Sequence, residues 1–314
     1  MTPTSAEIKA KALEIGFTST GILPAERLGA AEGRLIEWLS RGYHGSMAWM
    51  EREPEKRADP RLLMPGCRSV IVCTLNYFTP HEHPDAALHG KISRYAWGDD
   101  YHDVLRAKFR ELLDWIRSEC PQVEGKICVD TAPFMDKAWA ERAGLGWIGK
   151  HTNLITREVG SWVFIGSLLV DVELSYDAPV PEDHCGTCRA CIDACPTAAI
   201  VEPYVLDASR CISYATIELR DEVLPPEIAE NLNGWIYGCD ICQEVCPWNR
   251  FQTPSPEAGF QPRKGQTSLS PVDLETMEHP EYAERFRGSP IKRAKLTGLK
   301  RNANAVNAQA KSQR

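Results

Sequence analysis

The stretch CGTCRACIDACP at residues 185–196 is the most informative part of this sequence. Its four cysteines follow the spacing C-x2-C-x2-C-x3-C-P, by which bacterial ferredoxins bind iron–sulfur clusters. In that arrangement three closely spaced thiolates bind one [4Fe–4S] cluster, and the fourth binds the other cluster. The run therefore predicts a ferredoxin-like domain with two [4Fe–4S] clusters that transfers electrons.

A second half of this pattern lies downstream, where Cys211 is followed, after an insertion, by C-x2-C-x3-C-P at residues 239–247. By the crossover rule, the first cluster is expected on Cys185, Cys188, Cys191 and Cys246. The second cluster is expected on Cys195, Cys211, Cys239 and Cys242. A pair of zinc sites is the alternative, because C-x2-C pairs also bind Zn²⁺. A zinc site requires neither the four-cysteine run nor its repetition, so the spacing favours clusters.

The composition sets limits on partners and location. The chain has 314 residues, 43% of them hydrophobic, and this length predicts two domains, or one with an insert. Its net charge of −7 gives it no general attraction to nucleic acid. The N-terminus lacks the pattern of an export signal, and no stretch reaches the roughly 18 apolar residues of a membrane span. We therefore expect a cytoplasmic protein. Four further cysteines without ligand spacing are expected to be buried apolar residues, namely Cys67, Cys73, Cys120 and Cys128.

Periodicity predicts an α+β domain at residues 1–176. A capping-box pattern at residues 4–7 predicts a helix that Gly16 ends. Further helices are expected at 103–118 and 136–143, and strands at 69–75, 126–131 and 161–174. A cysteine-rich domain is expected at 177–255 and begins with a proline-rich linker at 177–181. A helical tail is expected at 256–314. From residue 285 onward the tail has nine Lys or Arg and no acidic residue, which predicts either a solvated end or a phosphate-binding patch.

Several stretches outside the first cysteine run resemble one family closely. They are KRADP at 56–60, YAWGDDYH at 95–102, VDTAP at 129–133, AERAGLGWIGK at 140–150, CISY at 211–214, TIE at 216–218, GCDICQ at 238–243 and CPWN at 246–249. Together they resemble the epoxyqueuosine reductases. This resemblance implies a nitroreductase-like domain that binds cobalamin beside the two-cluster domain. It also implies an enzyme that reduces the epoxide of epoxyqueuosine, at the tRNA wobble position, to queuosine.

The resemblance further implies that cobalamin receives electrons from the two clusters, which an external flavodoxin or ferredoxin would reduce. We expect a monomer without a membrane partner. Many family members carry a helical-repeat extension at the C-terminus, which we expect this chain to lack. A corrinoid reductive dehalogenase is an alternative enzyme, although those proteins typically carry a twin-arginine signal. A non-enzymatic two-cluster electron carrier is the other alternative.

Opening an epoxide leaves an alkoxide that needs a proton, so an acid must lie nearby. Asp130 follows a predicted strand and matches the family's proton donor, and Asp136 is the alternative, although an aspartate after a strand is often only a cap. The resemblance suggests these cofactor contacts: Arg57, Trp97, Asp130, Lys150, Asn153, Ile155, Ser213 and Gln243.

The segment DYHDVL at 100–105 lacks the glycine of the Asp-x-His-x-x-Gly motif by which a histidine binds cobalt. We therefore expect base-off cobalamin, with His102 as a capping or surface residue. In the tail we expect these tRNA contacts: Arg287, Lys292, Arg293, Lys295 and Arg301.

Overall fold

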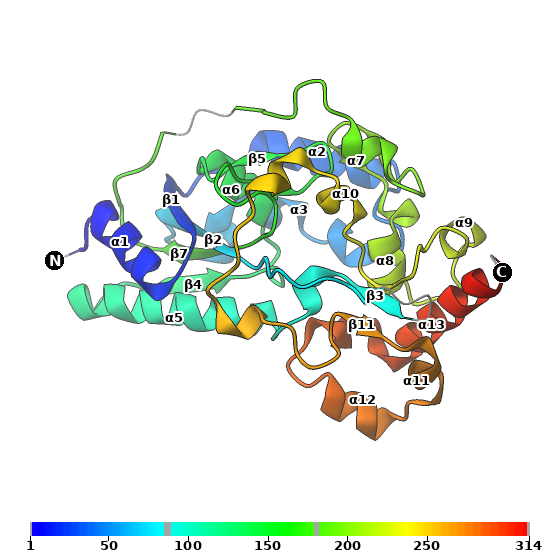
Figure 1. Cartoon of the computed structure of the whole chain (residues 1–314). Coiled ribbons are helices and arrows are strands. Elements are labelled where there is room, and N and C mark those ends of the chain that lie inside the picture. Colours follow the sequence, from blue (N-terminus) through cyan, green and yellow to red (C-terminus); the bar gives the residue numbers. More distant parts are fainter. Residues whose placement is uncertain (1, 85–88, 179–181, 313–314) are drawn as a thin grey trace.

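A four-stranded antiparallel sheet with the order β1-β2-β7-β4 forms the centre of the first half of the chain. A computed structural model describes residues 2–84, 89–178 and 182–312 (Figure 1). Residues 179–181 of the predicted linker and 313–314 of the predicted tail lie outside the described residues.

The strands are β1 (Ser19–Pro24), β2 (Ser69–Asn76), β3 (Gly90–Ile92), β4 (Gly125–Cys128), β5 (Trp147–Ile148), β6 (Leu154–Ile155), β7 (Val163–Val170), β8 (Ile200–Glu202), β9 (Val205–Leu206), β10 (Trp235–Tyr237) and β11 (Ser268–Leu269). The α-helices are α1 (Ser5–Ile15), α2 (Gly29–Ser40), α3 (Pro54–Ala58), α4 (Pro60–Leu63), α5 (Tyr101–Glu119), α6 (Asp136–Arg142), α7 (Ala190–Asp193), α8 (Ile212–Ile217), α9 (Pro226–Ala229), α10 (Ile241–Glu244), α11 (Pro271–Thr276), α12 (His279–Arg285) and α13 (Lys295–Ser312). Short 3₁₀ helices are η1 (Ala48–Glu51), η2 (Arg94–Ala96), η3 (Ala208–Arg210), η4 (Pro247–Phe251), η5 (Ala258–Phe260) and η6 (Pro290–Ala294).

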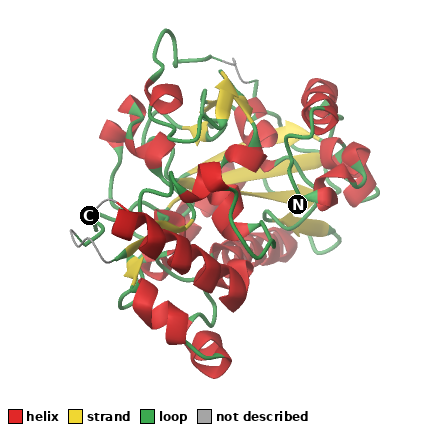
Figure 2. Ribbon diagram, turned by 90° about the vertical axis from the view of Figure 1, so that its right-hand side faces the viewer, coloured by secondary structure: helices red, strands yellow, loops and turns green. Residues whose placement is uncertain are grey.

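Helices cover both faces of this sheet (Figure 2). Every residue of β2 is buried, because successive side chains point to opposite faces and both faces are packed. Ile71 and Cys73 belong to the core with α1 and α5, whereas Val70 and Val72 belong to the core with α2 and α6. Figure 1 shows α5 below the strands and α6 above them. The sheet thus forms the middle of three layers.

The predicted elements of the first domain are present. The capping box of Thr4 and Glu7 starts α1, and Gly16, with a φ of 103°, ends it. The other predicted helices and strands match α5, α6, β2, β4 and β7, with shifted ends. β4 ends at Cys128, earlier than predicted, because the chain turns at Asp130, whose φ is +53°. The four cysteines without ligand spacing are all buried, as predicted.

A second, three-stranded sheet has the order β10-β3-β11 and combines strands from all three predicted segments. Its core contains Trp97, Trp235, Phe286 and Leu299. Besides strand β11, the described part of the tail contains helices α11, α12 and α13, and α13 packs against α8, α11 and β10. The boundaries at 176 and 255 stay predictions, but the three segments share this core. Within the described residues, no helix is long and apolar enough to cross a membrane.

The side chain of Asn302 joins α13 to this core. Asn302 is fully buried, and its Nδ2 donates to the backbone oxygens of Thr216 at 2.9 Å and Ile236 at 2.8 Å. Asn302→Ala is expected to lower the free energy of unfolding by about 1–3 kcal/mol, because buried carbonyl groups lose their partner. Thermal unfolding of the cluster-loaded protein measures this as a lower Tm. Asn304→Ala, at an exposed position of the same helix, should leave the Tm unchanged. Equal Tm values for both variants would contradict the role of Asn302.

Candidate active site and cluster sites

The eight motif cysteines lie around two neighbouring cavities. The larger one, here called the large cavity, has a volume of about 410 Å³ and is lined by Cys195, Cys211, Cys239 and Cys242. The smaller one, here called the small cavity, has about 160 Å³ and is lined by Cys185, Cys188, Cys191 and Cys246. These two groups are the sets that the crossover rule predicts. Two groups of four thiols are the donor set that two [4Fe–4S] clusters require, and ligation by these residues stays a prediction.

The hairpin of β5 and β6 supports the loop that carries the first cysteines. Lys150 follows β5, and its Nζ donates to the backbone oxygens of Gly186 at 2.5 Å and Cys188 at 2.9 Å. These bonds tie the loop of the cysteine-rich segment to the first domain. Lys150 also lines the small cavity.

The buried side chain of Asn249 joins the second cysteine loop to the start of β7. Its Oδ1 accepts from the Ser161 backbone N at 2.7 Å, and its Nδ2 donates to the Gln243 backbone oxygen at 2.6 Å. Gln243 Nε2 in turn donates to the Ser161 backbone oxygen at 3.1 Å. Gly160 has to be a glycine here, because a Cβ would lie 2.1 Å from Asn249 Oδ1.

Asp130 lines the large cavity together with the second cysteine set. Tyr101 donates its hydroxyl proton to Asp130 Oδ2 at 2.6 Å, and His102 Nε2 lies 3.2 Å from the same oxygen. His102 Nδ1 lies 2.7 Å from Asp100 Oδ1. The imidazole is therefore held between two carboxylates, and Asp130 does not act as a simple helix cap.

These contacts determine where protons reside. Desolvation acts to lower the pKa of His102, but hydrogen bonds and charge from Asp100 and Asp130 raise it to about 9. Desolvation acts to raise the pKa of Asp130, but the bonds from His102 and Tyr101 outweigh it and hold this pKa below its ordinary value. Desolvation and the charge of Asp130 raise the pKa of Tyr101 well above its ordinary value. At neutral pH, Asp130 is thus an anion next to two proton donors.

Two further ionisable residues line the large cavity beside Asp130. Asp136 Oδ1 is buried without a hydrogen-bond partner among the described residues. Desolvation and the charge of Asp130 raise the pKa of Asp136 well above its ordinary value. Lys137 Nζ donates to the Thr152 backbone oxygen at 2.9 Å and to Asn153 Oδ1 at 3.2 Å.

The remaining predicted cofactor contacts divide into two groups. Asn153, Ser213 and Gln243 line the large cavity with Asp130. Arg57, Trp97, Lys150 and Ile155 do not belong to the lining of the large cavity. Their contacts with a cofactor stay predictions.

Each of the four has another structural role. Trp97 is fully buried and donates its Nε1–H to the Ile92 backbone oxygen at 2.7 Å. Arg57 donates to the Trp49 backbone oxygen at 2.9 Å and packs over that indole. Ile155 is fully buried and, with Lys150, lines the small cavity.

Aromatic and polar residues that the sequence reasoning missed complete the large cavity. They include Tyr77, Tyr95, Tyr101, Lys137, His151 and Phe164. A volume of about 410 Å³ lies in the range of roughly 300–1,000 Å³ typical of small-molecule sites. Asp136 Oδ1 and His151 Nε2 are buried without partners among the described residues, which fits a ligand that offers hydrogen-bonding groups, such as the amides of a corrinoid.

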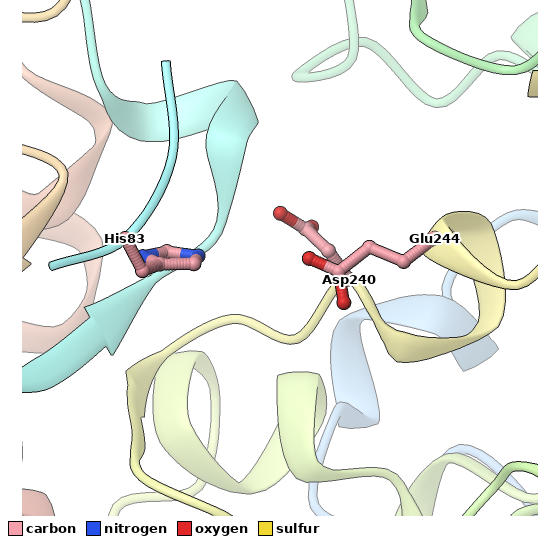
Figure 3. Close-up of side chains that lie close together, drawn as sticks. All are labelled: His83, Asp240 and Glu244. Carbon is pink, nitrogen blue, oxygen red and sulfur yellow. The ribbon is translucent and has the colours of Figure 1, made fainter. Parts of the chain in front are cut away.

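Another group of polar residues lies outside both cavities. Figure 3 shows His83 across from Asp240 and Glu244, and ligand atoms of the three lie within 4.8 Å of one another. Asp240 already accepts hydrogen bonds from Ser93 Oγ and the Arg94 backbone N. His83 Nδ1 donates to the Thr267 backbone oxygen at 2.8 Å. These bonds account for Asp240 and for His83 Nδ1, whereas His83 Nε2 is buried without a partner among the described residues. We assign no metal here.

The predicted tRNA contacts also divide. Arg287, Lys292, Arg293 and Lys295 are exposed, and Arg293 pairs with Glu218 through two bonds of 2.8 and 2.6 Å. Arg301 differs from these four, and its contact with tRNA stays a prediction. Its guanidinium donates to three backbone oxygens, those of Ala215, Leu219 and Asp221, and so holds the end of α8.

Comparisons with known proteins identify the family. A family model described as "Epoxyqueuosine reductase QueG, DUF1730" matches residues 57–131, and one described as "4Fe-4S double cluster binding domain" matches residues 184–249. The epoxyqueuosine reductase of Cellulophaga algicola is 50% identical over 295 residues, which cover 94% of this chain and 95% of that protein. The epoxyqueuosine reductase of Synechocystis sp. is 49% identical over 276 residues, 88% and 94% of the two chains.

A solved structure shows the same fold over nearly the whole chain. It is a crystal structure of an epoxyqueuosine reductase with an epoxyqueuosine-modified tRNA-Tyr stem loop. It is 32% identical, has a TM-score of 0.91, and covers 98% of this chain and 81% of that chain. Since the curated relatives are similar over almost their full length, the chain belongs to the epoxyqueuosine reductase family.

Proposed function

We propose that this protein reduces the epoxide of epoxyqueuosine in tRNA to queuosine, with cobalamin in the large cavity and two [4Fe–4S] clusters as the electron supply. One observation carries the proposal. The large cavity has the second cysteine set in one part of its wall and Asp130 with Tyr101 in another. A substrate in this cavity therefore has an electron source and a proton source within the same enclosure.

The conversion of an epoxide to an alkene takes up two electrons and two protons and releases water. When bound, the corrinoid supplies a cobalt centre that accepts electrons one at a time from the clusters and reduces the epoxide carbon. The residues of the chain that would hold it are Asn153, Ser213 and Gln243 in the cavity wall. His102 is engaged by two carboxylates through its ring nitrogens, which supports base-off binding without His102 as a ligand.

The protein's own part in the chemistry is to deliver a proton. Asp130 Oδ2 accepts hydrogen bonds from Tyr101 and protonated His102, so Asp130 can take up a proton from His102 and pass it to the oxygen of the opening epoxide. Asp136 lines the same cavity, and its raised pKa makes it the alternative proton donor.

The finer organisation belongs to the same proposal. Residues 1–176 would form the nitroreductase-like domain that holds the corrinoid, and the sheet with helices on both faces supports this. Residues 177–255 would carry the clusters, and 256–314 would contact tRNA. Cys188, in the first set, is exposed, which supports reduction of that cluster by an external flavodoxin or ferredoxin. The donor's identity and the monomeric state stay predictions.

Asp130→Asn is expected to lower turnover by about 10²–10⁴-fold, because an amide cannot take up a proton from His102 and pass it to the opening epoxide. The assay is anaerobic conversion of tRNA carrying epoxyqueuosine, with nucleosides measured by mass spectrometry. Iron, sulfide and cobalamin content should equal those of the wild type. Asp103→Asn, at an exposed position of α5 next to His102, is the control and should turn over normally. Normal turnover by Asp130→Asn would remove Asp130 from the proton-donor role.

The rate should also decline as the pH rises through about 9. Because the pKa of His102 is raised from 6.5 to about 9, its proton is present at all lower pH values and lost above them. Asp100→Asn removes one of the two carboxylates that raise this pKa, so it should move the alkaline decline to lower pH. The pH profile of single-turnover rates measures this. An unchanged profile in Asp100→Asn would rule out His102 as the titrating group.

Binding of tRNA should depend on the exposed lysines at the start of the last helix. Lys292→Gln with Lys295→Gln is expected to weaken binding and to reduce the steepness of its salt dependence by about one unit per lost phosphate contact. Lys311→Gln is the control, because Lys311 lies 16 residues further along α13, about 24 Å from Lys295. Titrations of labelled tRNA at several salt concentrations measure both quantities. The same slope in all variants would exclude this surface.

A further inference from the structure

The indole of Trp147 lies against the first cysteine set. Trp147 is only 3% exposed and forms a small buried cluster with Ile155 and Cys246, against which Cys185 and Trp248 pack. The rings of Trp147 and Trp248 meet edge to face, with centroids 4.8 Å apart. Trp147 is thus part of the packing around the small cavity, although no function has been assigned to it above.

The indole N–H of Trp147 has no acceptor. Its Nε1 is buried and makes no hydrogen bond within the described part of the chain. An indole N–H can only donate a hydrogen bond, so it is satisfied only when an acceptor atom lies next to it. Trp248, beside the same cysteines, differs in this respect, because its Nε1 donates to the His184 backbone oxygen at 3.3 Å.

The local structure fixes the position of this indole before any cluster binds. Trp147 pairs with Ile155 in the β5–β6 hairpin, and the Ile148 backbone N donates to Glu141 Oε1 at 3.0 Å. Gly146 precedes it with a φ of +155°, and a Cβ there would lie 2.1 Å from the Ile155 backbone oxygen. Only glycine permits this approach, so the orientation of Trp147 is built into the hairpin.

The Cys185 sulfur is the best candidate acceptor for the indole N–H of Trp147. The Cys185 side chain packs against the small buried cluster formed by Trp147, Ile155 and Cys246. A cluster-bound thiolate is a stronger acceptor than a thiol, since hydrogen bonds to charged groups are the strong ones.

We propose that Trp147 Nε1–H donates a hydrogen bond to the Cys185 thiolate of the first cluster and thereby makes this cluster easier to reduce. A donor to a cluster sulfur favours the reduced state, which carries one more negative charge. Trp147 is thus a positioning residue that tunes electron transfer into the protein. This inference rests on cluster binding by the first cysteine set, but it requires neither cobalamin nor tRNA.

Trp147→Phe tests it, because phenylalanine keeps an aromatic ring and removes the N–H. The two cluster potentials are measured by redox titration of the anaerobically purified, cluster-loaded protein, followed by electron paramagnetic resonance. One cluster should become harder to reduce by on the order of tenfold, which is about 59 mV for a one-electron couple. The other potential, and the iron and sulfide content, should stay unchanged.

Trp248→Phe is the matched control. It removes an indole from the same side of the first cysteine set, but one whose N–H already has a backbone acceptor. In Trp248→Phe, the change in each cluster potential should be only a small fraction of the change that Trp147→Phe causes. Unchanged potentials in Trp147→Phe with full cluster content, or an equal shift in both variants, would overturn the proposal.

A second measurement keeps the proposal testable if the Phe variant loses the cluster. Wild-type protein labelled with indole-¹⁵N tryptophan should show a ¹⁵N hyperfine coupling to the reduced first cluster. The coupling should persist in labelled Trp248→Phe protein. Its absence from the labelled wild type would overturn the proposal. Neither readout involves turnover, so these results stand apart from the assay of tRNA reduction.

Discussion

The buried hydrogen bonds of Asn249 are the interaction on which the site depends most. They bind the loop of Cys239, Cys242 and Cys246 to the residues just before β7. β7 pairs with β2 along its whole length and with β4, which ends just before Asp130. One network of buried polar groups therefore fixes these cysteines relative to β7 and, through β7, relative to β4, the strand that leads to Asp130. A buried network of this kind requires all of its members, because an amide left unpaired in the interior is costly.

This arrangement lets electrons and protons reach the large cavity from different parts of its wall. In the proposed reaction, the cysteines of the second set supply the electrons, and Tyr101, His102 and Asp130 supply the proton. At neutral pH the proton resides on His102, whose pKa is about 9, and not on Asp130. In the proposed mechanism, Asp130 is then the last member of a proton relay. In this proposal, Asp130 receives its proton from its neighbours Tyr101 and His102 and then serves as the acid.

The sequence predicted those features that depend on local spacing. The cysteine runs, the capping box of α1 and the buried strand β2 each reflect interactions among residues close in the chain. The position of Asp130 came from the resemblance, since an aspartate after a strand is usually only a cap. Tyr101 and His102 were missed, because a helix start with Asp-Tyr-His does not reveal that a loop some 28 residues later will fold onto it. The signal was the motif YAWGDDYH itself, which the family shares.

Side-chain direction explains why several predicted contact residues lie away from the large cavity or the surface. Trp97 and Ile155 lie in matching segments, yet both are fully buried in packing. Lys150 lies in the predicted glycine-rich turn, but its ammonium group points to the cluster loop. Arg301 belongs to a basic stretch, yet its guanidinium is engaged by backbone oxygens inside the molecule. Composition and spacing specify which residues are near in sequence, whereas these roles depend on contacts between distant segments.

The most direct measurement of the central claim is mass spectrometry of nucleosides from tRNA carrying epoxyqueuosine after anaerobic reaction. The protein is loaded with both clusters and cobalamin and given a strong chemical reductant. The account predicts that epoxyqueuosine disappears and that queuosine, lighter by one oxygen atom, takes its place in equal amount. Unchanged epoxyqueuosine, with iron, sulfide and cobalamin all at full content, would contradict it.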